Sequence, residues 1–254
     1  MDEPLLFEIE DGVATITINR ERRRNAIDDA TLIALRDALD AAKHERLGAI
    51  VMRGAGTQAF SAGSDIKALA ALNRDEKIAH TERGQDIADA IERHPVPVIA
   101  AIEGYCLGGG LEMAMACDYR IAGDGATLGL PEVRRLGGLP SWGATVRLPR
   151  IVGVARAREM ILFGRALSAD EALEWGLVNR ATAAGEAYAE ALVMAKEFAA
   201  EVDPGAAAMA KQLLTFGYDA PTQAGRHMAY LADITQLASD ALDSGLDGFA
   251  KKDK

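Results

Sequence analysis

The spacing of hydrophobic residues changes near residue 28. Residues 7–9 and 13–19 alternate between apolar and polar positions on either side of a turn, which is typical of two paired strands. From Asp28 to residue 42 the apolar residues instead recur every three or four positions, which predicts an amphipathic helix. Asp28 or Asp29 is expected to cap the N-terminus of this helix.

The next part of the chain alternates between strand and helix patterns. Two of its expected strands are apolar at every position, as central strands of parallel sheets are. The expected elements, in the order strand, polar helix, strand, short helix, strand, are residues 49–52, 75–93, 98–102, 111–116 and 119–122. This alternation predicts an α/β fold with a largely parallel sheet.

After about Ser141 the strand signal nearly disappears. Ser168 and Glu171 have the spacing of a helix capping box, and proline-initiated helices are expected from residues 204 and 221. We therefore predict an α/β core over residues 1–190. A helical C-terminal region over residues 191–254 is expected to make subunit contacts.

Composition and charge limit the classes of function. The 254 residues carry 28 basic and 38 acidic side chains, a net charge of −10, which disfavours nucleic acid as a partner. Neither Cys106 nor Cys117 lies in a Cys-x-x-Cys pair, and no signal peptide is evident, so a reducing cytoplasmic location is expected. No apolar run is long enough to cross a membrane, and the four histidines lack metal-ligand spacing, so neither a membrane partner nor a metal is expected.

Two glycine-containing loops are candidates for binding an anionic or polar ligand. Residues 108–110 are three glycines at a strand-to-helix turn, where unpaired backbone N–H groups can stabilise a developing oxyanion. Residues 60–67 form a second such loop, whose small residues open onto a helix start. The alternatives are a simple tight turn at the first loop, and at the second a helix cap by Ser64 or Asp65 with a solvated Lys67.

Three features supply ionisable groups. Glu112 lies in an otherwise apolar helix, and Glu132 follows a short strand expected at residues 127–130. Burial would raise the pKa of such carboxyl groups into the range useful for proton transfer. A salt bridge to Arg134 or Arg135 is the alternative for Glu132. Residues 20–24 form a basic cluster that suits phosphate or is simply a solvated loop.

Together these segments resemble the crotonase superfamily, the enoyl-CoA hydratase/isomerase fold. The resemblance runs nearly end to end. It rests on residues 60–67 (FSAGSDIK), 97–105 (PVIAAIEGY), the triple glycine with Glu112, residues 130–132 (LPE), 147–149 (RLP) and 176–178 (GLV). It implies an α/β crotonase (ClpP-like) fold, in which stacked ββα units form a spiral core followed by a helical C-terminal region.

The resemblance also implies an acyl-CoA thioester as substrate, with its carbonyl oxygen between the backbone N–H groups of Ser64 and Gly109. Coenzyme A enters as part of the substrate, and no prosthetic group is expected. The positions implied to bind it are Arg22, Arg23, Ala62, Asp65, Ile66, Lys67, Phe249 and Lys252, although the tail around the last two only approximates the usual pattern.

Hydratases of this superfamily resemble one another in having both glutamates, and both are present here. The resemblance therefore implies reversible hydration of a trans-2-enoyl-CoA, with Glu112 as base and Glu132 as acid. A carnitinyl-CoA-like dehydratase, a Δ3-Δ2-enoyl-CoA isomerase and a hydrolase that acts on an unusual acyl group remain alternatives, as does a non-catalytic binding protein. The resemblance further implies a homotrimer or a dimer of trimers.

One residue departs from the pattern. Where the family usually has small residues after Leu139-Pro140, this chain has Ser141-Trp142. If Trp142 lines the acyl pocket, its bulk would shorten or reshape the acyl chain that the pocket accepts.

Overall fold

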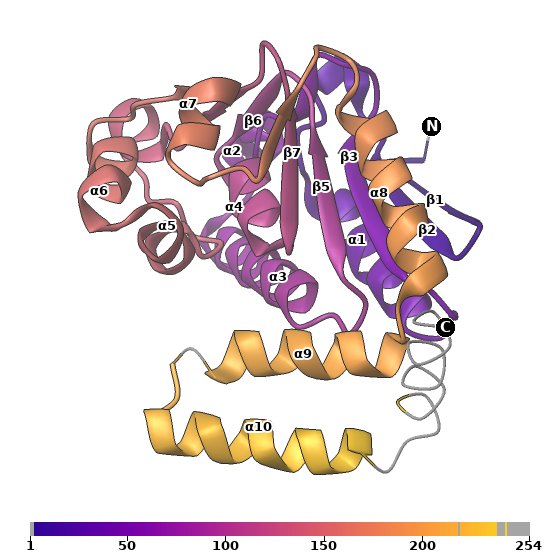
Figure 1. The fold of residues 1–254 in the computed structure, drawn as a ribbon. Helices are drawn as coiled ribbons and strands as arrows, with labels where there is room; N and C mark the ends of the chain where they lie inside the picture. The colour runs from indigo at the N-terminus through magenta and orange to yellow at the C-terminus, as the bar shows by residue number, and fades with distance from the viewer. Residues whose placement is uncertain (1–2, 218, 238–241, 243–254) are drawn as a thin grey trace.

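The computed structural model describes residues 3–217, 219–237 and 242, and it contains two β-sheets surrounded by helices (Figure 1). The larger sheet has the strand order β1-β2-β3-β5-β7-β10, and the smaller has the order β4-β6-β8-β9. The strands are β1 (Leu5–Glu10), β2 (Val13–Ile18), β3 (Ala49–Gly54), β4 (Ala59–Ser61), β5 (Val98–Ile102), β6 (Tyr105–Leu107), β7 (Tyr119–Gly123), β8 (Thr127–Gly129), β9 (Leu167–Ser168) and β10 (Arg180–Thr182).

The described residues also form ten α-helices and two shorter helical turns, and the last three helices follow the final strand. The helices are α1 (Asp29–Ala42), α2 (Ile66–Ala71), α3 (Arg74–Glu92), α4 (Gly109–Ala116), α5 (Ala144–Val152), α6 (Val154–Leu162), α7 (Ala169–Glu174), α8 (Ala187–Glu201), α9 (Pro204–Gly217) and α10 (Thr222–Leu237). The turns are the 3₁₀ turn η1 (Glu21–Arg23) and the π-helical turn η2 (Glu132–Leu136).

The chain builds its core by repeating a ββα unit. Strands β3, β5 and β7 pair in parallel in the larger sheet, and each is followed by a strand of the smaller sheet, β4, β6 and β8. After β4 and β6, helices return the chain to the larger sheet, whereas after β8 the chain first adds β9 to the smaller sheet and then returns through α7. This arrangement is the stacked ββα spiral that the resemblance implies.

Both faces of the larger sheet are covered, which explains why β5 is apolar at every position and β3 is apolar from Ala49 to Met52. Alternate residues of the strands pack against α8 on one face, through Ala187, Ala191 and Ala195. The opposite residues join the main core, which includes the buried faces of α1 and α3. The Glu103 carboxylate, in the β5–β6 turn, accepts hydrogen bonds from the N–H groups of Gly185 and Ala187 and so fixes the start of α8.

Most local predictions agree with the structure. Asp28 caps α1 by accepting a hydrogen bond from the Thr31 N–H, and Ser168 and Glu171 form the predicted capping box of α7. The structure differs from the prediction after Ser141, where the sequence pattern indicates almost no strand but β9 and β10 are both present. These strands have only two and three residues, too few for alternation of apolar and polar positions to be recognised.

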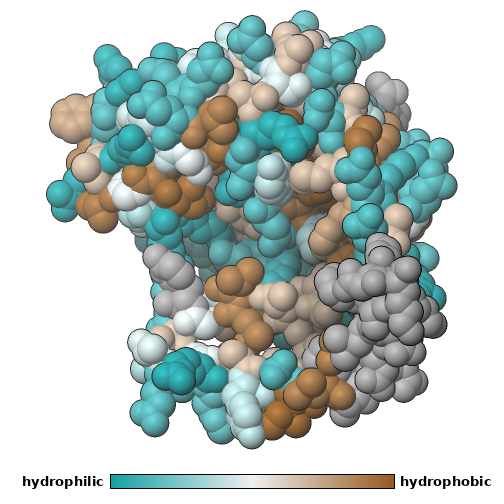
Figure 2. All heavy atoms as spheres, viewed as in Figure 1, coloured by the Kyte–Doolittle hydropathy of each residue, from teal (hydrophilic) through white to brown (hydrophobic). Residues whose placement is uncertain are grey.

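Helices α9 and α10 lie side by side below the sheets in Figure 1. Helix α9 is fixed to the core by buried Lys211, whose Nζ is 2.6 Å from the Asp118 carboxylate and also donates to the Ile91 and Val96 carbonyl oxygens. Figure 2 shows apolar side chains at the surface of this helical pair. The exposed large apolar residues of α9 and α10 include Leu214, Phe216, Leu231, Ile234 and Leu237.

Helix α8 includes residue 190 and packs against the larger sheet. The division into a core over residues 1–190 and a C-terminal region over residues 191–254 stays a prediction. No helix in the described part of the chain is long and apolar enough to cross a membrane. Residues 3–217, 219–237 and 242 also contain no group of three or more histidine, cysteine or acidic side chains suited to hold a metal ion.

Candidate active site

A cavity of about 390 Å³ lies where the loops after β4, β6 and β8 approach α3. Its lining includes residues from all three loops, together with side chains from α3 and α4 and from the segment that leads to α5. Among these are Ala62, Ser64, Ile66, His80, Gly109, Glu112, Glu132 and Trp142. The fold therefore brings together most of the residues that sequence motifs had indicated separately.

Two of these loops touch at their glycines. A Cβ on Gly63 would lie 2.7 Å from the Leu107 carbonyl oxygen and 3.3 Å from the Gly109 nitrogen, so only glycine permits this approach. Gly108 has φ +51 and ψ −128, a conformation that side chains disfavour, and it serves as the N-cap of α4. Within the described residues, no acceptor pairs with the Ser64 N–H or with the Gly109 N–H. Two free amide donors therefore stand in loops that meet at the cavity.

Glu112 is only 2% exposed and is held by the backbone of the next loop. Its Oε1 accepts hydrogen bonds from the N–H groups of Trp142 (2.8 Å) and Ala144 (2.9 Å). Burial raises the pKa of Glu112 to about 7, an ionised Glu132 contributes to this shift, and the two backbone N–H groups oppose it. At neutral pH this carboxyl group is therefore close to half ionised.

Glu132 begins η2 directly after Pro131, and its surroundings differ from those of Glu112. Its Oε2 is buried and has no hydrogen-bond partner among the described residues. Burial raises the pKa of Glu132, which favours the protonated form. The expected alternative, an ion pair with Arg134 or Arg135, is not formed among the described residues. Arg134 instead donates to the Phe163 carbonyl oxygen, and Arg135 lines the cavity.

Trp142 lines the cavity and is only 3% exposed. Cβ atoms on Gly84 and Gly109 would lie 2.0 and 2.3 Å from its ring, so both glycines make room for the indole. The buried Arg147 donates to the Trp142 carbonyl oxygen and pairs with carboxylates of α3, which holds this loop against the helix. The loop that orients Glu112 is thus fixed by both packing and charge.

His80 is a cavity residue that sequence reasoning missed. Its Nε2 lies 2.8 Å from the Ser64 Oγ, and its Nδ1 lies 2.9 Å from the Asp29 Oδ1. The residue is 5% exposed. Its spacing to Gly84, Ile87 and Ile91 places it on the buried stripe of α3, and that helical period was the available signal.

The positions implied to bind coenzyme A differ in their exposure and in their contacts with the cavity. The Asp65 carboxylate caps α2 through the N–H groups of Lys67 and Ala68, and it also pairs with Arg20. Partial burial would raise the pKa of Asp65, but these hydrogen bonds and the Arg20 charge outweigh it and lower the pKa. Ala62 and Ile66 line the cavity, whereas the side chain of Lys67 is exposed.

Arg22 and Arg23 are exposed on η1. The segment that follows them is hydrogen-bonded to the cavity loop, since the Ala62 N–H donates to the Arg24 carbonyl oxygen. The two guanidinium groups therefore project from a segment adjoining the cavity. The remaining implied positions, Phe249 and Lys252, lie outside the described residues.

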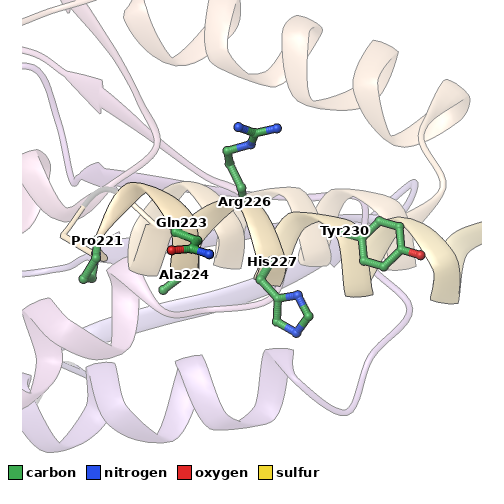
Figure 3. Close-up of a pocket in the computed structure, with 6 residues that line it drawn as sticks. All are labelled: Pro221, Gln223, Ala224, Arg226, His227 and Tyr230. Atoms are coloured by element: carbon green, nitrogen blue, oxygen red, sulfur yellow. The ribbon is translucent and has the colours of Figure 1, made fainter.

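A larger hollow of about 650 Å³ lies on α10, lined only by residues between Pro221 and Tyr230. Figure 3 shows that Arg226 and His227 point to opposite sides of this single helix. Its polar groups do not converge as those of a binding site do. The cavity beside Glu112 and Glu132 is therefore the candidate active site.

The fold and this cavity define an α/β protein of the crotonase type, and comparison with known proteins identifies its family. The sequence model described as enoyl-CoA hydratase/isomerase matches residues 8–254, and the chain belongs to this family. An enoyl-CoA hydratase from Bacillus anthracis superimposes with a TM-score of 0.94 at 35% identity, covering 98% of this chain and 96% of that chain.

Curated relatives agree with this assignment. Crotonyl-CoA hydratase of Syntrophomonas wolfei is 39% identical over 171 residues, which cover 67% of this chain and 65% of the relative. A probable enoyl-CoA hydratase of Bacillus subtilis is 44% identical over 168 residues, which cover 65% of this chain and 64% of the relative. The matched part of the chain thus spans just under two thirds of these relatives.

Proposed function

We propose that this protein catalyses the reversible addition of water across the α,β double bond of a trans-2-enoyl-CoA. The observation that carries the proposal is that two glutamates with raised pKa values, buried Glu112 and half-buried Glu132, line the same cavity as the Ser64 and Gly109 loops. Relatives named as hydratases of enoyl-CoA and crotonyl-CoA support it.

In this proposal the thioester carbonyl oxygen accepts hydrogen bonds from the N–H groups of Ser64 and Gly109. Such donors stabilise the enolate that forms as water attacks the β-carbon, an effect of about 3–4 kcal/mol per donor. Gly109 is the first residue of α4, so the positive end of that helix adds to the effect.

Glu112 is the base that takes a proton from the attacking water, because its carboxyl group is substantially ionised at neutral pH. Glu132 is the acid that delivers a proton to the α-carbon, because burial favours its protonated form. The roles exchange in dehydration, in which Glu132 takes the proton from the α-carbon and Glu112 returns a proton to the hydroxyl group that leaves the β-carbon as water.

The rest of the coenzyme A is proposed to lie along Ala62, Asp65, Ile66 and Lys67, with Arg22 and Arg23 contacting phosphates. Phe249 and Lys252 remain the proposed C-terminal contacts. Coenzyme A acts as part of the substrate, and no prosthetic group takes part in the proposed reaction.

A homotrimer or a dimer of trimers is proposed as the assembly, and the exposed apolar residues of α9 and α10 are suited to subunit contacts. Light scattering after size-exclusion chromatography measures this directly. A reducing, cytoplasmic location is also proposed, and it is compatible with the free, buried thiols of Cys106 and Cys117.

The function is tested by incubating the purified protein with crotonyl-CoA and following the enoyl-thioester absorbance. We expect the absorbance to fall to an equilibrium value, and 3-hydroxybutyryl-CoA to restore the same value from the other side. A 3-enoyl-CoA and a carnitinyl-CoA are the control substrates. Turnover of either without hydration of crotonyl-CoA would replace the proposed activity by isomerisation or by dehydration of carnitinyl-CoA.

A further inference from the structure

A chain of hydrogen bonds runs from the cavity to the start of α1, and the proposed hydration does not use it. The Ser64 Oγ lies 2.8 Å from His80 Nε2, and His80 Nδ1 lies 2.9 Å from Asp29 Oδ1. The three side chains come from the loop after β4, from α3 and from α1. Ser64 and His80 both line the cavity.

The partners of Asp29 define the direction of these hydrogen bonds. An ionised carboxylate only accepts hydrogen bonds, so His80 Nδ1 donates to Asp29. In the neutral imidazole Nε2 then has a free lone pair, and it accepts the hydrogen bond of the Ser64 hydroxyl. Partial burial would raise the pKa of Asp29, but hydrogen bonds from His80 and Arg83 outweigh it and lower the pKa, which keeps the carboxylate ionised.

The position of the His80 ring is restrained from a second side. The centroid of the ring lies 5.5 Å from that of Trp142, at an angle of 57°. Only 6% of the His80 side chain is exposed, whereas 36% of the Asp29 side chain is exposed. Ser64 and His80 thus line the cavity, whereas Asp29 is more exposed and is not among the residues that line it.

We propose that the cavity has a second activity, the hydrolysis of acyl-CoA thioesters through an acyl-enzyme on Ser64. A hydroxyl bonded to a base, which is itself oriented by a carboxylate, is the arrangement that activates serine for nucleophilic attack. The backbone N–H of the nucleophile can also form part of the oxyanion hole, as in serine proteases. Ser64 supplies both the hydroxyl and one of the two free amides.

The reaction balances without a further reagent. The Ser64 Oγ forms a bond to the thioester carbon while His80 takes the hydroxyl proton, and the electron pair of the carbonyl moves to its oxygen. Collapse of this intermediate breaks the carbon–sulfur bond, and His80 gives the proton to the thiolate of coenzyme A. Water then attacks the ester with His80 as base, which releases the carboxylic acid and restores Ser64.

This proposal relies on the proposed function for the position of the thioester carbonyl, but it assigns no step to Glu112 or Glu132. A saturated thioester separates the two activities, because it has no double bond to hydrate. Butyryl-CoA is the probe, and release of free thiol is followed with a chromogenic thiol reagent.

We expect the wild-type protein to release coenzyme A from butyryl-CoA above the rate in buffer. Ser64→Ala and His80→Gln should each slow this release by about 10²–10⁴. His44→Gln is the matched control, because His44 is exposed on the surface, and it should leave the release unchanged. No release by the wild type, or equal release by Ser64→Ala, would overturn the proposal.

A second measurement reports the nucleophilicity of Ser64 without any coenzyme A. A fluorophosphonate reacts with an activated serine hydroxyl, forming a phosphorus–oxygen bond and releasing fluoride. We expect mass spectrometry of the digested protein to find the label on Ser64 in the wild type. Labelling should be much slower in His80→Gln, and equal melting temperatures of this variant and the wild type show that the variant is folded. Absence of label on Ser64 in the wild type would contradict an activated hydroxyl.

Asp29 acts through His80 and is a positioning residue. Asp29→Asn should slow labelling of Ser64 and shift the ¹⁵N resonances of the His80 ring. Asp37→Asn, an exposed position on the same helix, should do neither. An unchanged labelling rate in Asp29→Asn would show that Asp29 does not position His80 for this reaction.

The two proposals can fail independently. Absence of crotonyl-CoA hydration with release of coenzyme A from butyryl-CoA would overturn the hydratase alone. Hydration of crotonyl-CoA without that release would overturn the Ser64 proposal alone.

Discussion

Two chemically different groups of side chains line the cavity. In the first, Glu112 is buried and Glu132 is half-buried, and one oxygen of Glu132 has no hydrogen-bond partner among the described residues. In the second, the hydroxyl of Ser64 is connected through His80 to a partly exposed carboxylate, Asp29, which also pairs with Arg83. The first group holds acidic protons unusually tightly, whereas the second fixes the orientation of a base.

The difference follows from what each buried group contacts. A carboxyl group that loses water and gains few donors is easier to protonate, so its pKa rises. A histidine that gains an acceptor on one side and a hydroxyl donor on the other is restricted to one tautomer. Each group is therefore suited to a different kind of proton transfer.

The largest effect is expected from removing either acid. Glu112→Gln and Glu132→Gln should each slow hydration of crotonyl-CoA by about 10²–10⁴, because each deletes one general acid–base group. The steady-state rate measures this, and calorimetric titration with a saturated acyl-CoA should show that binding survives. Full hydratase activity in Glu132→Gln would disprove the mechanism that uses both carboxyl groups.

A smaller loss is expected when one amide donor is removed. Gly109→Pro lacks the N–H and should lower kcat by about 10²–10³. A Cβ at this position would lie 2.3 Å from the Trp142 ring, so any side chain at position 109 would clash with the indole. Trp142→Ala removes this clash. Gly109→Pro and Gly109→Ala are therefore both made with Trp142→Ala. Equal kcat values in the two double variants would exclude a role for this N–H.

The raised pKa of Glu112 has a consequence for stability. The native carboxyl group, with a pKa of about 7, binds its proton more tightly than the unfolded one, at about 4.5. The native state therefore loses stability as pH rises through this window, by about 3 kcal/mol in total. Glu112→Gln removes this titration and should be more stable than the wild type at pH 8, although less active.

Urea unfolding of the wild type and of Glu112→Gln at pH 5 and pH 8 measures the difference. Glu8→Gln is the control, because Glu8 is exposed on β1. If the stability gap between Glu112→Gln and the wild type stays constant across this pH range, Glu112 does not titrate as described.

The smallest effect is expected at the indole. Trp142 fills space beside Gly84 and Gly109, so Trp142→Ala enlarges the cavity and should shift the preference toward longer acyl chains by several-fold in kcat/KM, since each added methylene contributes roughly 1 kcal/mol. Enoyl-CoAs of four, six and ten carbons provide the measurement. The same order of preference in both proteins would show that Trp142 does not limit the acyl chain.

Much of the fold could be predicted from local patterns. The cap at Asp28, the capping box at Ser168 and the apolar strand at residues 98–102 depend on neighbours in the sequence, and the structure agrees with each. The strands β9 and β10 could not be predicted with the same certainty. Their pairing with β8 and β7 depends on residues distant in the chain.

The sequence by itself determined which residues are available for chemistry: one glutamate in an apolar helix, a second glutamate after a short strand, and two glycine-containing loops that become strand-to-helix turns. Periodicity and turn chemistry are local, so they identify such groups without the rest of the molecule. Only the tertiary structure decided that Glu112 is held by the backbone of residues 142–144 and that His80 meets both Ser64 and Asp29. Those contacts join segments up to 51 residues apart, and packing of the ββα spiral, not local spacing, sets them.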